Sequence, residues 1–162
     1  MKRDNYYIKR NIQDIDKTNE LLECLPPFCE DYFLGIEQRT SCQTRLKYAY
    51  DLRIFFDFLC KRKYRKKDVL DLTLEDLEGV TNNDIEFFLS YLSHYRFNEK
   101  SLSCDERAKA RKLSAVRAMF KYFFNKGLIE VDNSSKVQTP KLHEKEIIRR
   151  IPQEYPLSYE EA

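Results

Sequence analysis

Hydrophobic residues recur at helical spacing along much of this chain, most regularly in residues 105–127. There the apolar positions lie three or four residues apart: Leu113, Val116, Phe120 and Phe123. That spacing puts them on one face of a helix of about six turns, at about 3.6 residues per turn. Ser103 with Glu106 three residues later predicts a capping box at its start, and Gly127 marks its end.

The same pattern predicts three further helices before this one. They cover about residues 27–37, 41–62 and 81–95, with a short capped turn at 73–78 and a loop at 96–102. Thr40 with Gln43 predicts the cap of the second of these helices. This helix has apolar residues on two opposite sides, which is typical of a central helix buried by its neighbours. A single helical turn is expected at residues 133–135.

Glycine and proline are too sparse for a sheet protein rich in turns. The chain has three glycines, and no proline between residues 28 and 139. We therefore predict an all-α fold, a bundle of four to five helices over residues 26–137. Residues 1–25 form a partly helical extension, expected either to be disordered or to dock on a partner subunit. Residues 138–162 have the composition of a linker, and their last six residues look like the start of another helix.

Charge is segregated along the chain although the net charge is only +2. Residues 41–67 have a balance of +7 and residues 100–126 of +6, whereas residues 68–99 have −7. A second stripe on the helix over 105–127 carries basic and small residues: Arg107, Arg111, Ser114, Ala118 and Lys121. Such a stripe favours contact with a large anionic surface such as duplex DNA, and the competing interpretation is an ordinary solvated face.

No other recognisable chemistry is encoded in motif form. The five cysteines form no C-x-x-C pair, and their odd number without a signal peptide predicts reduced thiols in a cytoplasmic protein. The two histidines, His94 and His143, lie far apart, and neither metal-ligand spacing nor a phosphate-binding loop is present. No apolar run reaches the ~18 residues that span a bilayer. We expect no metal, no cofactor and no membrane contact.

Four motifs follow one another along the chain. They are Thr44-x3-Tyr48-x2-Asp51-Leu52, then Ile85-Glu86-x2-Leu89-x-Tyr91-Leu92, then Arg111-Lys112-Leu113-Ser114-Ala115-Val116-Arg117-x2-Phe120-x2-Phe123, then Lys126-Gly127-Leu128-Ile129-x3-Asn133-Ser134. Their order and spacing resemble the core-binding domain of tyrosine recombinases, a family that includes phage-type integrases, integrases of mobile elements and Xer-type recombinases. The resemblance covers about residues 28–142.

The resemblance implies a SAM-like orthogonal bundle of four helices that forms half of a clamp around a recombination half-site in double-stranded DNA. The helices over 41–62 and 105–127 would cross and face the duplex. It places DNA contacts at the following residues: Thr44, Lys47, Arg107, Arg111, Ser114, Arg117 and Lys121. Most would contact phosphates, and Arg107 or Arg111 would be the first candidate for reading a guanine edge.

The family's chemistry is not expected in this chain. Its central His-x-x-Arg motif is absent, since Phe97 follows His94 and Glu146 follows His143 at that spacing. We therefore expect no catalytic residue and no strand cleavage here, with a catalytic domain beyond the linker. The full-length protein is expected to self-associate on DNA.

Some positions keep a second interpretation. Thr44 is also explained as a residue of the first helical turn, Tyr48 as a core residue, and Arg117 as an ion-pair partner of the acidic helix. The alternative function is a helical protein–protein interaction module that mediates oligomer assembly. A helix-turn-helix regulator is disfavoured, because no pair of predicted helices has the 3–4-residue turn of that motif.

Overall fold

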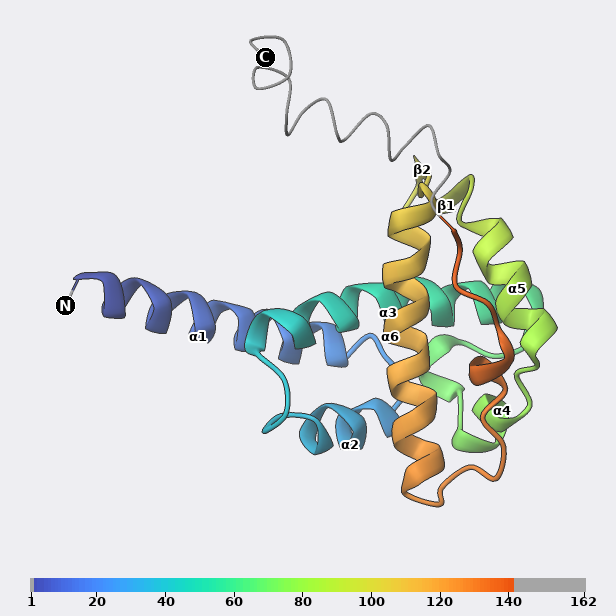
Figure 1. The fold of residues 1–162 in the computed structure, drawn as a ribbon, viewed down its shortest axis with the longest axis horizontal. Helices are drawn as coiled ribbons and strands as arrows, with labels where there is room; N and C mark the ends of the chain where they lie inside the picture. Colours follow the sequence, from blue (N-terminus) through green and yellow to red (C-terminus); the bar gives the residue numbers. More distant parts are fainter. Residues whose placement is uncertain (1, 142–162) are drawn as a thin grey trace, which may run out of the picture.

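Two long helices, α3 (Cys42–Arg62) and α6 (Glu106–Asn125), cross and pack against each other at the centre of the domain (Figure 1). The computed structural model describes residues 2–141 of the chain. Those residues form six α-helices, two short 3₁₀ helices and one two-stranded hairpin. This arrangement confirms the prediction of an all-α bundle.

The other elements surround these two helices. α1 (Lys2–Leu22) packs along α3, while α2 (Phe28–Gly35) contacts α6. Downstream of α3 the chain forms η1 (Val69–Asp71), α4 (Leu74–Glu78) and α5 (Asn82–Tyr91), and after α6 it forms η2 (Asn133–Lys136), which packs on both α5 and α6. α3 is thus the central helix that its two apolar sides predicted.

Aromatic side chains fill the space between the helices. Phe55 of α3 lies edge-to-face on Phe88 of α5, with ring centroids 5.1 Å apart. Phe28 of α2 lies edge-to-face on Phe123 of α6 at 5.5 Å. Edge-to-face pairs add about 0.5–1.5 kcal/mol each beyond the burial of their surface. These contacts join α2, α3, α5 and α6 in one hydrophobic core.

Two predicted helix starts are wrong by one or two residues. α3 is capped by Ser41, whose side chain accepts from the amide three residues later at 3.1 Å, and not by Thr40. α6 is capped by Asp105, whose carboxylate accepts from the amide three residues later at 2.8 Å, and not by Ser103. Ser, Thr and Asp are all good caps, so adjacent candidates could not be separated by pattern alone.

Three other predicted helix boundaries agree with the structure. Thr73 and Thr81 each begin a helix with a full capping box. Gly127 ends α6 with φ of +73°, a left-handed conformation that glycine adopts without strain. The amide of Leu128 donates to the carbonyl of Phe123 at 2.9 Å, which completes a Schellman motif. The helical turn expected at 133–135 is η2.

Residues predicted as a loop form a hairpin instead. β1 (Tyr95–Phe97) pairs antiparallel with β2 (Lys100–Leu102), and α5 ends earlier than predicted, at Tyr91. The two turn residues, Asn98 and Glu99, have φ of 51° and 64°. Positive φ at both central positions is what a two-residue type I′ turn requires. Glu is uncommon there, so the sequence carried no hairpin signal.

Residues 2–22 form one continuous helix rather than a partly helical segment. Leu21 and Leu25 belong to the hydrophobic core, and Thr18 is buried beside them. The first half of α1 extends away from the other helices (Figure 1). Most of the predicted linker, residues 142–162, lies outside the described residues. No helix within residues 2–141 is long and apolar enough to cross a bilayer.

Candidate nucleic-acid interface

A hollow of about 410 Å³ lies where the first turns of α3 meet the first half of α6. Its walls come from both helices: Thr44, Lys47, Tyr48, Tyr50, Asp51, Ala108, Arg111, Lys112 and Ser114. Four of the seven predicted DNA-contact residues line it: Thr44, Lys47, Arg111 and Ser114. Residues more than sixty positions apart in the sequence are thus brought to one surface by the crossing of the helices.

The spacing of residues along α6 places some side chains in the core and others on this surface. Leu113 and Phe120 are buried, whereas Arg111 and Ser114 are exposed on the other side. The Ser114 hydroxyl donates to the carbonyl of Ala110 at 3.0 Å. That bond keeps the short side chain against its own helix, so a ligand surface can approach the α6 backbone closely.

An ion pair joins the two helices at this hollow. The Lys112 ammonium lies 2.8 Å from the Asp51 carboxylate, and both side chains are only 16% and 17% exposed. A pair sheltered in this way is screened less by salt than an exposed one. It fixes α3 against α6 and removes Lys112 from the set of unpaired cations.

The two predicted residues of α3 differ in what surrounds them. Thr44 lies in the first turn of α3, where its backbone amide and its hydroxyl both bond to Ser41. The capping contact therefore explains Thr44 without a ligand. Lys47 is exposed one turn further on, at the rim of the hollow. Tyr48 is partly buried against the core, as its second interpretation predicted.

A second hollow, of about 580 Å³, continues this surface along α6. It shares Tyr48 with the first hollow and includes the predicted residue Lys121. Two cations that the sequence analysis missed also line it, Arg39 from the α2–α3 loop and Lys126 from the end of α6. Their proximity depends on how the loop packs against α6, for which the sequence has no periodic signal. We call the surface around both hollows the α3–α6 face.

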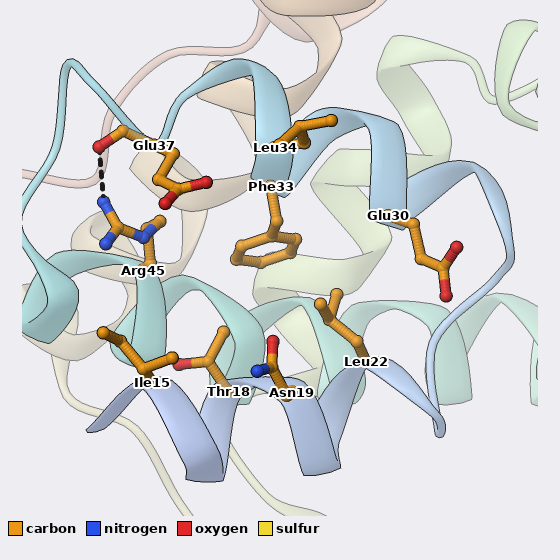
Figure 2. A pocket seen from close by; sticks show the side chains of 9 residues that line it. All are labelled: Ile15, Thr18, Asn19, Leu22, Glu30, Phe33, Leu34, Glu37 and Arg45. Carbon is orange, nitrogen blue, oxygen red and sulfur yellow. Dashed lines mark hydrogen bonds between the residues drawn. The ribbon is translucent and has the colours of Figure 1, made fainter. Parts of the chain in front are cut away.

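A buried arginine holds the loop that carries Arg39. The Arg45 guanidinium donates to the carbonyl of Glu37 at 2.8 Å and to that of Thr40 at 2.6 Å. Figure 2 shows the first of these bonds. Arg45 is only 9% exposed, so its guanidinium bonds to the loop carbonyls and is not accessible to a ligand.

The remaining two predicted residues lie differently. Arg107 is exposed one turn before Arg111 but lines neither hollow. Arg117 turns toward the segment that follows α6, where its guanidinium donates to the carbonyl of Ser134 at 3.3 Å and to the Thr139 hydroxyl at 2.6 Å. It makes no ion pair with α5 within the described residues, and its contact with DNA stays a prediction.

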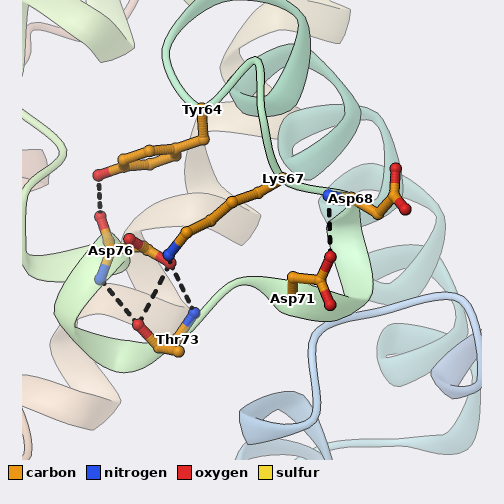
Figure 3. A network of polar contacts seen from close by, with 6 residues as sticks. All are labelled: Tyr64, Lys67, Asp68, Asp71, Thr73 and Asp76. Atoms are coloured by element: carbon orange, nitrogen blue, oxygen red, sulfur yellow. Dashed lines mark hydrogen bonds and ion pairs between the residues drawn. The ribbon is translucent and has the colours of Figure 1, made fainter.

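Two cations of the basic loop after α3 pair with the acidic segment. Lys63 lies 2.9 Å from Asp84, and Lys67 lies 2.7 Å from Asp76. Figure 3 shows Lys67 reaching into the capping box that Asp76 forms with Thr73. Burial raises the pKa of Asp76, but the bonds from Lys67 and Thr73 outweigh it and hold this pKa below its ordinary value.

The cations of the α3–α6 face are not paired in this way. Within residues 2–141, no acidic side chain lies within 4.0 Å of the charged atoms of five of them: Arg39, Lys47, Arg111, Lys121 and Lys126. The same holds for Arg107. Unpaired positive charge therefore gathers on this face although positive residues occur in two separate stretches of the sequence.

Comparison with known proteins shows the family to which the chain belongs. It is 31% identical over 129 residues to the tyrosine recombinase XerC of Caldanaerobacter subterraneus, a match covering 72% of this chain and 35% of that protein. XerC of Leptospira interrogans is 29% identical over 110 residues, covering 68% and 30%. XerS of Lactococcus lactis is 29% identical over 149 residues, covering 82% and 40%.

The chain belongs to the tyrosine recombinase family. It spans about a third of the length of these curated relatives. No protein-family model matches the sequence, and no solved structure matches it significantly. The resemblance seen in the four motifs is confirmed at the level of the family.

Other reactive groups of this recombinase-family chain are buried or dispersed. Burial raises the pKa of the Cys29 thiol and of the Tyr32 phenol well above their ordinary values, so neither is a ready nucleophile. Within residues 2–141 no three His, Cys, Asp or Glu side chains gather as a metal site would require. Tyr155 and Tyr159 lie outside the described residues.

Proposed function

We propose that the α3–α6 face binds the phosphate backbone of double-stranded DNA, as the core-binding part of a site-specific tyrosine recombinase. One observation carries the proposal: five cations without an acidic partner within residues 2–141 line the two hollows, whereas Lys63 and Lys67 of the basic loop are held by acidic residues. The curated relatives are recombinases by name, which makes DNA the polyanion to consider first.

The positions of these cations suit contact with both phosphate backbones of one duplex. Lys47 of α3 and Arg111 of α6 both line the first hollow. Arg107 and Lys121 lie fourteen residues apart on α6, or about 21 Å at 1.5 Å per residue. That length exceeds the ~12 Å width of the major groove, so one helix can reach backbone on both sides.

Phosphate contacts would supply affinity, and few residues would supply sequence preference. Lysine acts as a point charge, whereas the planar arginine guanidinium can also form two parallel bonds to a guanine edge. Arg107 and Arg111 are the arginines on the exposed side of α6 that have this freedom. Arg117 is occupied by the exit segment and is a weaker candidate.

Strand cleavage is assigned to a catalytic domain outside this chain, which would close a clamp from the opposite side of the DNA. The chain would then contribute binding to a recombination half-site during integration or recombination. Because this chain would form only half of the clamp, we expect its dissociation constant for random-sequence DNA to lie in the ordinary non-specific range of about 10⁻⁴–10⁻⁶ M at physiological salt.

The test is fluorescence anisotropy on a random-sequence duplex across a salt series. The variant is Arg107→Ala with Arg111→Ala. The control is Arg62→Ala with Arg65→Ala, which removes the same charge at the far end of α3. If both arginines of α6 contact phosphates, the log–log salt slope falls by about 1.8, at about 0.9 per contact.

The control variant should keep the slope of the unaltered chain. Equal loss in both variants would mean that only net charge matters, and unchanged binding by the α6 variant with an intact circular-dichroism spectrum would refute the assignment. Protein–protein association, the alternative function, is favoured by a different observation on α1, and it is tested without DNA.

A further inference from the structure

The first half of α1 exposes a set of large apolar side chains to solvent. The exposed fractions are 61% for Tyr6, 50% for Tyr7, 56% for Ile8, 52% for Ile12 and 42% for Ile15. Within residues 2–141, no other element covers them, and α1 extends past the end of α3 (Figure 1). Contiguous exposed apolar side chains on a monomer mark interaction sites more often than isolated ones do.

The three isoleucines form a stripe that is distinct from the side of α1 packed on the domain. Ile8, Ile12 and Ile15 follow one another at spacings of four and three, which places them on one helix face. Thr18 and Leu21, which are buried, lie on the neighbouring face. The isoleucine face is therefore free for a second helix while α1 stays attached to its own domain.

The stripe continues into a groove between α1 and α2. This groove has a volume of about 370 Å³ and is lined by both helices and Arg45: Ile15, Thr18, Asn19, Leu22, Glu30, Phe33, Leu34, Glu37 and Arg45. Figure 2 shows Ile15 and Leu22 on α1 with Phe33 of α2 directed toward them. Leu34 on the outer side of α2 is 69% exposed. A helix lying on the isoleucine stripe would thus meet further apolar surface at its end.

Charge along α1 indicates what the occupant is. Residues 2–10 hold four Lys/Arg and one Asp, whereas residues 11–23 hold four Asp/Glu and one Lys. The helix is therefore basic in its first half and acidic in its second. Two such helices attract each other when they run antiparallel, because each basic half then lies on an acidic half. In a parallel pair like charges would lie side by side.

We propose that α1 pairs with α1 of a second copy of this chain in antiparallel orientation. The isoleucine stripes face each other across a two-fold axis, and Lys9 of each copy, which flanks its own stripe, lies near Asp16 of the other. Such a contact uses the same surface on both copies, as two-fold dimers do. It does not rest on DNA binding by the α3–α6 face.

The pair is small, so its affinity alone should be modest. We expect a dissociation constant between about 1 μM and about 1 mM, equivalent to roughly −8 to −4 kcal/mol. In a full-length protein bound at neighbouring sites, the effective concentration of the second copy would raise occupancy without any new contact.

The test is sedimentation equilibrium of the 162-residue chain without DNA. One variant carries Lys9→Glu, and another carries Asp16→Lys. Each should weaken self-association by at least about tenfold, which corresponds to ~1.4 kcal/mol. An equimolar mixture of the two should regain association, because each altered half then meets an opposite charge.

Two further variants test the apolar stripe. Ile12→Asp should abolish the pairing, whereas Gln13→Asp, the same change on another side of the helix, should weaken it far less. Circular dichroism checks that α1 stays helical. A chain that is monomeric at all concentrations overturns the proposal and leaves the stripe to another partner. Association that survives both charge variants, or a mixture that fails to regain it, overturns the antiparallel arrangement.

Discussion

Asp76 is the residue at which the charge segregation of this chain should have its largest measurable effect on stability. Its carboxylate accepts from the amide of Thr73 at 3.0 Å and from the Thr73 hydroxyl at 3.2 Å, and it pairs with Lys67 at 2.7 Å. The carboxylate is 13% exposed and the lysine 41%. One side chain thus closes a helix cap and ties the basic loop to the acidic segment (Figure 3).

The expected cost of removing it follows from these contacts. Loss of a cap costs about 1 kcal/mol. The ion pair adds about 0.5–1 kcal/mol, since the exposure of Lys67 lets solvent screen it. Asp76→Ala removes both and should lower the free energy of unfolding by about 2 kcal/mol at pH 7. Asp76→Asn keeps an acceptor for Thr73 and should cost about half of that.

Urea denaturation followed by circular dichroism measures this free energy, with an unchanged m value as evidence that the folded state is intact. Asp71→Asn is the matched control. Asp71 accepts from the amide of Asp68 at 3.2 Å in a similar capping box, and no lysine within residues 2–141 pairs with it. If Asp76→Asn costs no more than Asp71→Asn, the pairing with Lys67 contributes nothing and our account of the basic loop is wrong.

The pH dependence gives a second check. The pKa of Asp76 in the folded chain is lowered below its ordinary 3.8. The contribution is therefore fully present above that value and is lost as the pH falls through the lower pKa of the folded state. The difference between the Asp76→Asn chain and the unaltered chain should be constant from pH 7 to about pH 5 and shrink below about pH 4.

Three other outcomes can be checked by the same denaturation experiments. Gly35→Ala should destabilise the chain by about 1–3 kcal/mol, because a Cβ there would clash with the Tyr122 ring and hydroxyl, and a Tyr122→Ala background should remove most of that cost. Gly127→Ala should cost about 1 kcal/mol through its positive φ alone, since nothing lies within 4 Å, and Gly127→Asn should cost less. Burial, followed by the charges of Asp76 and Asp84, raises the pKa of Tyr64 to about 12, so stability should fall as the pH rises from 10 to 12, and Tyr64→Phe should remove part of that fall.

The helical framework was predictable because its signals are local. The apolar spacing of Leu113 to Phe123 and the boxes at Thr73 and Thr81 each depend on residues within two turns. α1 was underestimated because its isoleucines are exposed, so they do not combine with Leu21 into one buried stripe. The hairpin was missed because its turn uses a glutamate at positive φ.

The candidate site was predictable only where a helix repeat defines it. Arg111 and Ser114 share a face of α6 by spacing, and the family resemblance added Thr44 and Lys47. Arg39 could not be found, because its place beside α6 depends on loop packing. The local charge of residues 41–67 also overstated the basic surface. Lys63 pairs with Asp84 across 21 positions, and such pairing is set by the tertiary fold.

The buried Arg45 has a consequence for the entropy of binding. A backbone residue that must be ordered when a ligand arrives costs about 1–2 kcal/mol. Residues 37–40 are already held by the Arg45 guanidinium, so their ordering is completed during folding. The backbone of Arg39 is therefore already ordered at the edge of its hollow. In the proposed complex with DNA, a substitution of Arg45 would therefore weaken binding without removing a DNA contact, because the cost of ordering residues 37–40 would return to the binding step.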